Sequence, residues 1–350
     1  MINQKKVAIV ILNWNGEKLL QQYLPSVVEH SRDEDVKVVV ADNGSTDNSI
    51  DFVRKNFPSV AVICLNENYG FAKGYNVALQ KVDADYFILL NSDVEVTEGW
   101  IEPSIERMEA DLKIAAIQPK VLSYRQKNRF EYAGAAGGFI DKFGYPFCRG
   151  RILNINEQDK GQYDRPSPIF WATGACLFIR AGLFKMVGGF DEDFWAHMEE
   201  IDLCWRLKNR GFAVWYEPGS VVYHLGGGTL SYDNPKKIYL NFRNNLFMLF
   251  KNLPKGKAFF PFFVRMVLDG VAAIKFLANL NFKAFWAVCK AHAVFYKNFG
   301  RFNRKRKLLQ PVMSKTSHTE IFRSSIMWKF FIQKIKKFSE LNFDPYLNNS

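Results

Sequence analysis

Four short apolar segments alternate with segments of helical periodicity over the first 90 residues of this 350-residue chain. The apolar segments, which predict strands, span residues 7–12, 36–41, 60–65 and 86–90. The segments between them, which predict helices, span residues 17–30, 47–56 and 74–81. Strands at this spacing, with a helix between each pair, form βαβ units. The chain is therefore predicted to begin as an α/β domain with a mostly parallel sheet flanked by helices.

The fourth predicted strand ends abruptly in Asn91-Ser92-Asp93. Open α/β sheets place their ligands at the carboxyl ends of their strands, so a carboxylate here lies at the expected binding edge. A carboxylate is also what a divalent cation needs when it neutralises a diphosphate. The tripeptide alone suits a turn equally well, since Asn, Ser and Asp commonly follow strands.

The first strand lacks the loops that mark two common nucleotide-binding folds. The segment that follows it, Leu12-Asn13-Trp14-Asn15-Gly16, contains no GxGxxG or Walker sequence. An ordinary dinucleotide-binding fold and a P-loop NTPase are therefore disfavoured. The five cysteines form no CxxC pair. Their number and spacing argue for a reducing compartment and against a disulfide framework or a zinc site.

Charge divides the chain near residue 235. Residues 1–235 contain 25 Lys and Arg against 31 Asp and Glu, whereas residues 236–350 contain 22 against 4. We therefore expect one domain over residues 1–235, with an irregular excursion over 121–170, and a helical Lys- and Phe-rich region over 236–350. Regions of opposite charge are expected to have different partners.

The basic region predicts contact with a membrane surface rather than a membrane span. Its longest uncharged stretches are seven residues, against roughly 20 needed to cross a bilayer. If residues 275–304 form one helix, six basic residues share a stripe: Lys275, Lys283, Lys290, Lys297, Arg301 and Arg304. A basic stripe on an aromatic helix fits an anionic membrane surface. The alternative is a helix packed on the preceding domain with a solvated lysine face, and no nucleic-acid-binding motif accompanies the charge.

Four segments stand in one order along the chain: Asp42-Asn43-Gly44-Ser45-Thr46-Asp47, Asn91-Ser92-Asp93, Glu199-Glu200-Ile201-Asp202-Leu203-Cys204-Trp205-Arg206 and His224-Leu225-Gly226-Gly227-Gly228. Residues 68–76, 171–175 and 188–192 support them. With these segments, residues 5–250 resemble the family-2 glycosyltransferases of the GT-A fold, and most of all the bacterial rhamnosyltransferase branch. Those enzymes are inverting and use nucleotide-diphosphate sugars. The resemblance implies that residues 1–235 form a GT-A catalytic domain with a nucleotide-sugar-binding sheet.

The resemblance implies a donor site that includes Asn13, Asp42, Asn91 and Asp93, and we add Lys73, which stands where many relatives have a small residue. Asp42 is expected to accept a hydrogen bond from the base or ribose of the donor, with a turn-forming role as the alternative. Lys73 is expected to reach a phosphate, with a solvated lysine as the alternative.

The resemblance also implies a Mg²⁺ or Mn²⁺ site at Asn91-Ser92-Asp93, which matches the metal motif written DxD. Because its first position is Asn, Asp93 must carry the coordination, together with both phosphates and water. His224 is implied near the metal or the diphosphate, and glycines 226–228 would let the backbone approach phosphate. A partly buried histidine that closes a strand is the alternative for His224.

An inverting transfer needs one group that takes the proton of the acceptor hydroxyl. Residues 194–210 predict a helix that ends at Gly211, and on it Glu199, Asp202 and Arg206 share one face. Glu200 instead borders the apolar face, where partial desolvation raises its pKa and suits a base. The resemblance independently places the base at this second acidic position. Glu200 is therefore predicted as the base, with Glu199, Asp202 and Arg206 as supporting residues.

Trp171 and the Thr173-Gly174 that follows it are expected to form part of the acceptor floor, because an aromatic face suits a sugar ring. A plain core tryptophan is the alternative for Trp171.

The sequence thus predicts an enzyme that transfers a sugar, with rhamnose as a candidate, from a UDP- or dTDP-sugar to a glycan or lipid-linked acceptor in cell-surface polysaccharide synthesis. The alternatives are a nucleotidyltransferase, whose glycine-rich N-terminal loop is not visible, and a non-catalytic membrane- or polyanion-binding module. Only six apolar residues follow Lys5-Lys6, without a small-residue cleavage site, so no signal peptide is predicted. We expect a cytoplasmic protein at the inner face of the cell membrane, without nucleic acid as a partner.

Overall fold

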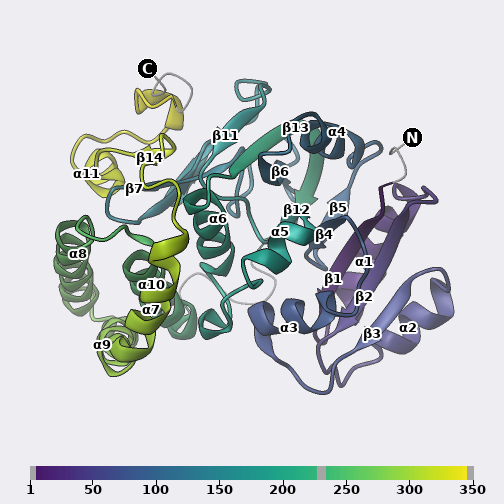
Figure 1. The fold of residues 1–350 in the computed structure, drawn as a ribbon, viewed down its shortest axis with the longest axis horizontal. Helices are drawn as coiled ribbons and strands as arrows, with labels where there is room; N and C mark the ends of the chain where they lie inside the picture. Colours follow the sequence, from purple (N-terminus) through teal and green to yellow (C-terminus); the bar gives the residue numbers. More distant parts are fainter. Residues whose placement is uncertain (1–4, 227–233, 345–350) are drawn as a thin grey trace.

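The computed structural model describes residues 5–226 and 234–344. A nine-stranded sheet runs through the centre, and a smaller five-stranded sheet lies beside its β11 end (Figure 1). The helices of the C-terminal region gather at the opposite side of the molecule from β3 and α2.

The first half of the large sheet follows the predicted pattern. Its strands are β1 (Val7–Asn13), β2 (Val36–Asp42), β3 (Ala61–Cys64) and β4 (Tyr86–Leu90). They lie in the order β3-β2-β1-β4 and all pair in parallel. The helices between them are α1 (Glu17–Glu29), α2 (Ser49–Asn56) and α3 (Gly70–Leu79). The predicted sheet flanked by helices is confirmed.

The second half of the large sheet is mixed in direction. β12 (Cys176–Arg180) pairs antiparallel with both β4 and β6 (Ile114–Ser123). β13 (Ala213–His224) runs parallel to β6 and carries β11 (Ser167–Ile169) and β5 (Val94–Val96) antiparallel to itself. The helices of this half are α4 (Glu102–Ala110), α5 (Ala181–Met186) and α6 (Glu199–Asn209). The parallel arrangement is thus confined to the strands up to β4 and to the β6–β13 pair.

The small sheet occupies the segment that the sequence predicts as irregular. In spatial order its strands are β10 (Ile155–Asn156), β9 (Arg151–Ile152), β8 (Pro146–Cys148), β7 (Gly138–Asp141) and β14 (Ile321–Phe322). The prediction of irregular structure is wrong for residues 138–156, because strands of two to four residues are too short to show a period. The last strand, β14, comes from the C-terminal region and runs parallel to β7.

The basic region folds into several helices: α7 (Pro235–Asn252), α8 (Phe259–Ala278), α9 (Phe282–Lys297), α10 (Phe299–Leu309) and α11 (Ile326–Phe331). The single helix considered over residues 275–304 is wrong, because α8 ends at Ala278 and α9 ends at Lys297. The six basic residues therefore lie on three helices and form no single stripe. Among the described residues, no helix combines the length and the apolarity that crossing a bilayer requires.

The C-terminal region shares one hydrophobic core with the domain that precedes it. Phe338 is buried, and its ring centroid lies 5.3 Å from that of Phe139 and 6.2 Å from that of Phe147 in the small sheet. Its backbone N–H donates to Glu157 Oε1 at 3.0 Å. Burial of a large aromatic ring contributes strongly to stability.

We predict that Phe338→Ala lowers the free energy of unfolding by about 3–5 kcal/mol, the usual cost of truncating a buried Phe. The matched control is Phe260→Ala in α8, whose side chain is 66% exposed and which should change the free energy by about 0.5 kcal/mol or less. Urea unfolding of the two variants measures both effects, and equal losses would contradict the shared core.

Candidate functional site

The carboxyl ends of β1 and β2 bring Asn13 and Asp42 side by side. The two residues are register partners, both are buried, and the Asn13 amide donates to Asp42 Oδ1 at 3.1 Å. Asp42 Oδ2 accepts the backbone N–H of Ser45 at 3.0 Å, so Asp42 also makes the turn contact expected from its position. Asn13 Oδ1 is buried without a hydrogen-bond partner among the described residues. This edge of the sheet therefore contains a buried acceptor without a partner, and Gly16 lies against it, since a Cβ there would lie 2.3 Å from Asn13 Oδ1.

The end of β4 places Asp93 against His224. Asp93 Oδ1 lies 3.1 Å from Nε2 of His224, at the end of β13, and both side chains are buried. The backbone carbonyl of Asp93 accepts the N–H of Leu225 at 3.0 Å, while the N–H of Asn91 donates to Ala175 O at 3.0 Å. The structure thus brings together two motifs that are about 130 residues apart in the chain.

Glu131 completes this cluster, although the sequence analysis did not select it. Its Oε2 lies 3.0 Å from His224 Nδ1, so both ring nitrogens of His224 face carboxylates. Burial alone would lower the pKa of His224, but Asp93 and Glu131 outweigh it and raise that pKa to about 10. Gly226 packs on Glu131, since a Cβ at Gly226 would lie 2.4 Å from Glu131 Oε1. Glycines 227 and 228 of the same motif lie outside the described residues.

The residues present fit a divalent cation whose other ligands come from phosphate oxygens and water. Within the described ranges, no group of three His, Cys, Asp or Glu side chains gathers in an arrangement that would hold a metal ion. Asp93 offers a hard carboxylate oxygen, and His224 would offer an imidazole nitrogen beside it once the ion displaces the proton that its raised pKa retains. This donor set suits Mn²⁺ or Mg²⁺ when phosphate oxygens and water complete the shell. Asp93 and His224 are therefore the residues that would hold such an ion.

The helix that carries the predicted base begins later than the sequence indicates. α6 begins at Glu199, not at residue 194, so the predicted helix is wrong over residues 194–198. Residues 192–194 form a short 3₁₀ turn, and Trp195, His197 and Met198 all have positive φ, between 63° and 71°. Such a conformation costs a non-glycine residue of order 1 kcal/mol or more and persists only where tertiary contacts impose it. Glu199 and Glu200 consequently occupy the first turn of α6.

The two glutamates differ in exposure. Glu199 is 4% exposed, whereas Glu200 is partly exposed, and each has one oxygen, Oε2, without a hydrogen-bond partner among the described residues. Burial raises the pKa of Glu199 well above its usual range, and it also raises the pKa of Glu200, to about 7. The unpaired oxygen of Glu200 is itself buried. A carboxylate whose pKa lies near neutrality and whose oxygen has no partner suits proton abstraction from a hydroxyl that reaches it.

Helix α7 holds the turn in front of α6. The Asn244 amide donates to three backbone carbonyls of this turn, at Phe194 (3.0 Å), Ala196 (2.8 Å) and His197 (2.7 Å). From the other side, the N–H of Phe71 at the start of α3 donates to Trp195 O at 2.9 Å. These contacts satisfy the carbonyls of four consecutive residues, 194–197, and so hold the turn from which Glu199 and Glu200 project.

A family model described as glycosyl transferase family 2 matches residues 8–187, which is just over half of the chain. The chain belongs to glycosyltransferase family 2. The matched segment includes Asn13, Asp42 and Asp93 but ends before Glu199 and His224. Membership of this family decides against the nucleotidyltransferase and the non-catalytic module considered above.

Curated relatives include two bacterial rhamnosyltransferases. An N-acetylglucosaminyl-diphospho-decaprenol L-rhamnosyltransferase from Mycobacterium tuberculosis is 27% identical over 236 residues, which cover 62% of this chain and 75% of the relative. Rhamnosyltransferase WbbL from Escherichia coli is 23% identical over 258 residues, which cover 72% of this chain and 94% of the relative.

Two solved structures share the fold. GalNAc-T7, solved with UDP, GalNAc and Mn²⁺, has a TM-score of 0.56 at 17% identity and covers 73% of this chain and 49% of its own. The mannosyltransferase PcManGT from Pyrobaculum calidifontis, solved with GDP-Man and Mn²⁺, has a TM-score of 0.52 at 16% identity and covers 88% of this chain and 82% of its own. Both structures support the GT-A architecture of this glycosyltransferase.

In the glycosyltransferase, Asp202 and Arg206 connect α6 to its surroundings. Asp202 accepts hydrogen bonds from Arg206 Nε (2.8 Å) and Asn252 Nδ2 (2.7 Å), and its Oδ1 lies 2.8 Å from Lys251 Nζ. Arg206 also donates to the carbonyls of Val187 and Gly189, each at 2.7 Å. Both side chains are buried and bond other parts of the protein, whereas Glu199 does not join their ion pair.

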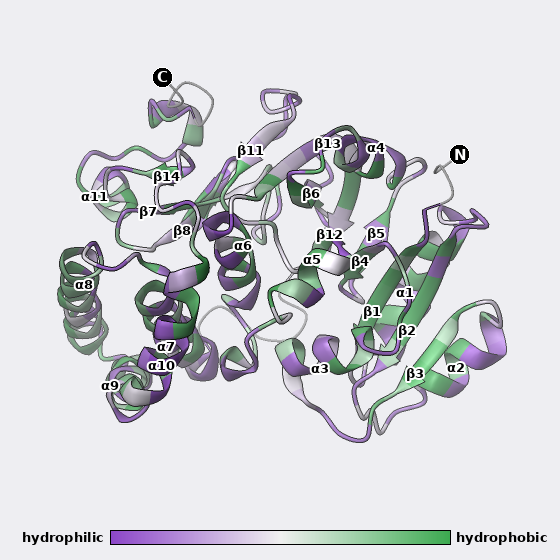
Figure 2. Ribbon diagram, viewed as in Figure 1, coloured by the Kyte–Doolittle hydropathy of each residue, from purple (hydrophilic) through white to green (hydrophobic). Residues whose placement is uncertain are grey.

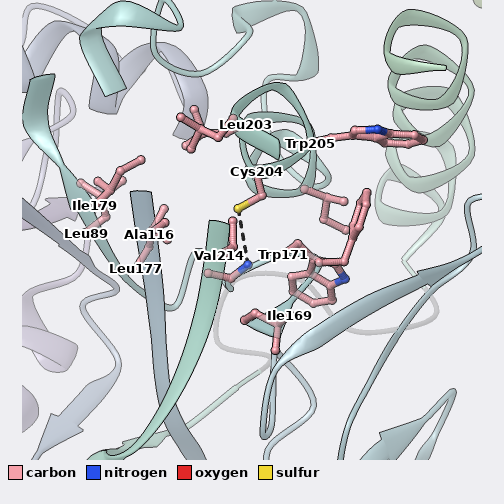
Figure 3. Close-up of a cluster of buried hydrophobic side chains, with 14 of the residues drawn as sticks. Leu89, Ala116, Ile169, Trp171, Leu177, Ile179, Leu203, Cys204, Trp205 and Val214 are labelled. Carbon is pink, nitrogen blue, oxygen red and sulfur yellow. Dashed lines mark hydrogen bonds between the residues drawn. The ribbon is translucent and has the colours of Figure 1, made fainter. Parts of the chain in front are cut away.

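The aromatic residues near α6 divide into a buried and an exposed one. Trp171 is 4% exposed, lies beside Ile169 and Cys204 in the core (Figure 3), and donates its indole N–H to Phe139 O at 2.9 Å. Trp195, which no local sequence pattern marks, is 37% exposed and has Lys236 Nζ 4.1 Å from its ring centroid.

Lys73, predicted to reach a phosphate of the donor, is partly exposed in α3, and its Nζ lies 4.2 Å from the ring centroid of Tyr69.

We predict that Asn244→Ala lowers sugar transfer at least about tenfold, because the turn that orients Glu199 and Glu200 loses three hydrogen bonds. The matched control is Asn245→Ala, which removes an equally buried amide that donates to Gly144 O at 2.7 Å, away from the turn. Both variants should lose about 1–3 kcal/mol of stability, the cost of buried carbonyls without partners. Transfer per folded molecule, measured below the melting temperature of each variant, separates the two, and equal losses of transfer would contradict a positioning role for Asn244.

Proposed function

We propose that this glycosyltransferase moves a sugar, with rhamnose as the first candidate, from a UDP- or dTDP-sugar to a glycan or lipid-linked acceptor in the synthesis of a cell-surface polysaccharide. The observation that carries the proposal is the pair of glutamates at the start of α6. Glu200 is partly exposed as a residue, its Oε2 is buried without a hydrogen-bond partner, and burial raises its pKa to about 7. The names of the relatives from M. tuberculosis and E. coli support rhamnose as the candidate sugar.

Asn13, Asp42, Asn91 and Lys73 are proposed to bind the donor. The free acceptor Asn13 Oδ1 and the Asp42 carboxylate lie together at the ends of β1 and β2, where they suit the N–H and O–H groups of a base and ribose. Lys73 adds a positive charge on α3 that suits a phosphate. An ion held by Asp93 and His224 would neutralise the charge that develops on the departing diphosphate.

The transfer itself is proposed to be a single displacement. The acceptor hydroxyl oxygen forms a bond to the anomeric carbon while the bond from that carbon to the diphosphate oxygen breaks, so the configuration inverts. Glu200 takes the hydroxyl proton as the new bond forms. Glu199 is deeply buried, and its burial raises its pKa well above the usual range, which favours its neutral form beside Glu200.

The reaction is proposed to take place at the cytoplasmic face of an anionic membrane. The M. tuberculosis relative is named for a lipid-linked acceptor, a diphospho-decaprenol. The excess of 22 Lys and Arg over 4 Asp and Glu in residues 236–350 gives the C-terminal region the charge that an anionic membrane attracts.

Asp93→Ala is expected to abolish the thermal stabilisation that Mn²⁺ and the donor together give the protein, and to lower transfer at least about 100-fold. A panel of UDP- and dTDP-sugars in the same thermal-shift assay identifies the donor. The control is Asp51→Ala on the exposed side of α2, which should leave the shift intact. Stabilisation of the Asp93 variant equal to that of the native enzyme would overturn the proposed role.

Glu200→Gln should lower transfer about 10²–10⁴-fold, the usual contribution of a general base, while the donor still stabilises the protein. Glu199→Gln should cost less than about tenfold, because Gln resembles the protonated Glu199 in shape and charge. A base works only when it is ionised, so transfer by the native enzyme should increase with pH through about 7 and then level off. If Glu199→Gln abolishes transfer and Glu200→Gln does not, the assignment of the base is wrong.

A further inference from the structure

Helix α8 exposes most of its large apolar residues and buries two charged ones, Arg265 and Asp269. Its buried residues are Arg265, Asp269 and Ala273. Its seven exposed large apolar residues, called here the α8 apolar face, are Phe259, Phe260, Phe263, Val267, Val271, Ile274 and Leu277. They recur mostly at intervals of three or four, which places them along one side of a helix. A helix that packs only on a water-soluble core shows the opposite arrangement.

The buried polar side fixes how α8 is rotated. Arg265 Nε donates to Asp269 Oδ1 at 2.7 Å, and His292 Nε2 of α9 lies 3.3 Å from Asp269 Oδ2. The Arg265 guanidinium also lies 3.9 Å from the ring centroid of Tyr145 and bonds Asn245 Oδ1. Rotating α8 to bury its apolar face would expose this network and strip buried charges of their partners, which is costly. The apolar face is therefore held outward by the structure itself.

The exposed apolar surface continues beyond α8. Leu280, Phe282 and Trp286, at the start of the neighbouring α9, are 76%, 54% and 65% exposed. In Figure 2, α8 forms an apolar edge of the molecule, with α9 below it. An exposed Trp beside aliphatic and Phe side chains is typical of residues that sit at a membrane interface.

The charges around this surface have one sign. Residues 253–319 contain thirteen Lys and Arg but only one acidic residue, Asp269, which is fully buried. Lys255, Lys257, Lys275 and Lys283 are exposed at or near the two ends of α8. A second copy of the chain on this face would bring these cations together and repel, whereas anionic lipid head groups would neutralise them.

We propose that α8 lies in the plane of an anionic bilayer, with the α8 apolar face inserted among the acyl chains and the flanking lysines on the head groups. Its 20 residues give it a length of about 30 Å, all of which can lie in the interface. This inference rests on the proposed function, because it names the surface on which a lipid-linked acceptor is met.

The inserted helix would be close to the catalytic turn through α7. Asn245 bonds Arg265 of α8, while its neighbour Asn244 bonds the carbonyls of Phe194, Ala196 and His197 in front of Glu199. Two consecutive residues of α7 thus connect the proposed membrane anchor with the proposed base. An enzyme docked through α8 would present its α6 turn at a fixed distance from the membrane.

Co-sedimentation of the full-length enzyme with vesicles tests the proposal. Native enzyme should sediment with vesicles of phosphatidylcholine and phosphatidylglycerol at low salt, and at least about tenfold less with pure phosphatidylcholine. The triple variant Phe260→Ser, Val267→Ser and Ile274→Ser should lose at least about tenfold in bound fraction on the anionic vesicles. The control variant Leu112→Ser, Met186→Ser and Leu308→Ser removes exposed apolar residues from other faces and should bind as the native enzyme does.

Native enzyme that stays in solution with anionic vesicles would overturn the proposal, as would a triple variant that binds as tightly as the native enzyme. A native dimer that the α8 substitutions dissociate, without vesicle binding, would assign the face to a second copy instead. Hydrolysis or transfer of the soluble donor tests the proposed sugar transfer separately from the proposed insertion of α8 into the bilayer. The α8 variant should retain donor turnover while losing the vesicles, and Asp93→Ala should bind the vesicles while losing turnover.

Discussion

Ion pairs between the acidic and the basic parts of the chain hold this glycosyltransferase together. Lys251 of α7 reaches both Asp191 and Asp202, at 2.8 Å from Asp202 Oδ1, and Lys208 of α6 pairs with Glu320 at 2.8 Å. All five side chains are largely buried. Removing one partner of such a pair leaves a buried charge and commonly costs 3–5 kcal/mol. Lys251 thus neutralises acidic residues of the first part, whereas Lys208 and Glu320 pair a base of the first part with an acid of the second. The charge count alone indicates neither contact.

Ion pairs of the same kind are found beside the turn in front of α6. Lys305 and Arg301 of α10 pair with Asp193, next to the turn that Asn244 holds. Arg301 is one of the six residues of the predicted basic stripe, and it pairs with Asp193 in the first 235 residues of the chain. The C-terminal region thus supports the turn before Glu199, while Lys255, Lys257, Lys275 and Lys283 lie exposed at or near the ends of α8.

The parts of this fold that the sequence predicts are those with a local signal. The runs that form β1, β2 and β4 are apolar, apart from the exposed Lys37 near the start of β2 and the polar last residues of β1 and β2, because both faces of a central strand are buried. Parallel pairing then places Asn13, Asp42 and Asp93 at one edge. Glu131 and Asn244 act through contacts with residues about 50–90 positions away, and no local pattern marks them. The left-handed conformations of Trp195, His197 and Met198 are imposed by tertiary contacts, so a helical pattern continued through them. The outward face of α8 is equally hidden, since apolar spacing shows that a face exists but not whether protein or solvent covers it.

The pairing of β14 with β7 has a consequence for how the chain is made. Ile321 is the register partner of Ile140, and Phe338 packs on the same small sheet. The small sheet can therefore be completed only after residues near the end of the chain have been translated. Contacts across about 180 residues close slowly, and an unpaired strand edge invites association with other chains in the meantime. A nascent chain of this enzyme would therefore complete its catalytic domain only after almost all of it has left the ribosome, and premature termination anywhere before residue 320 would leave the β7 edge open.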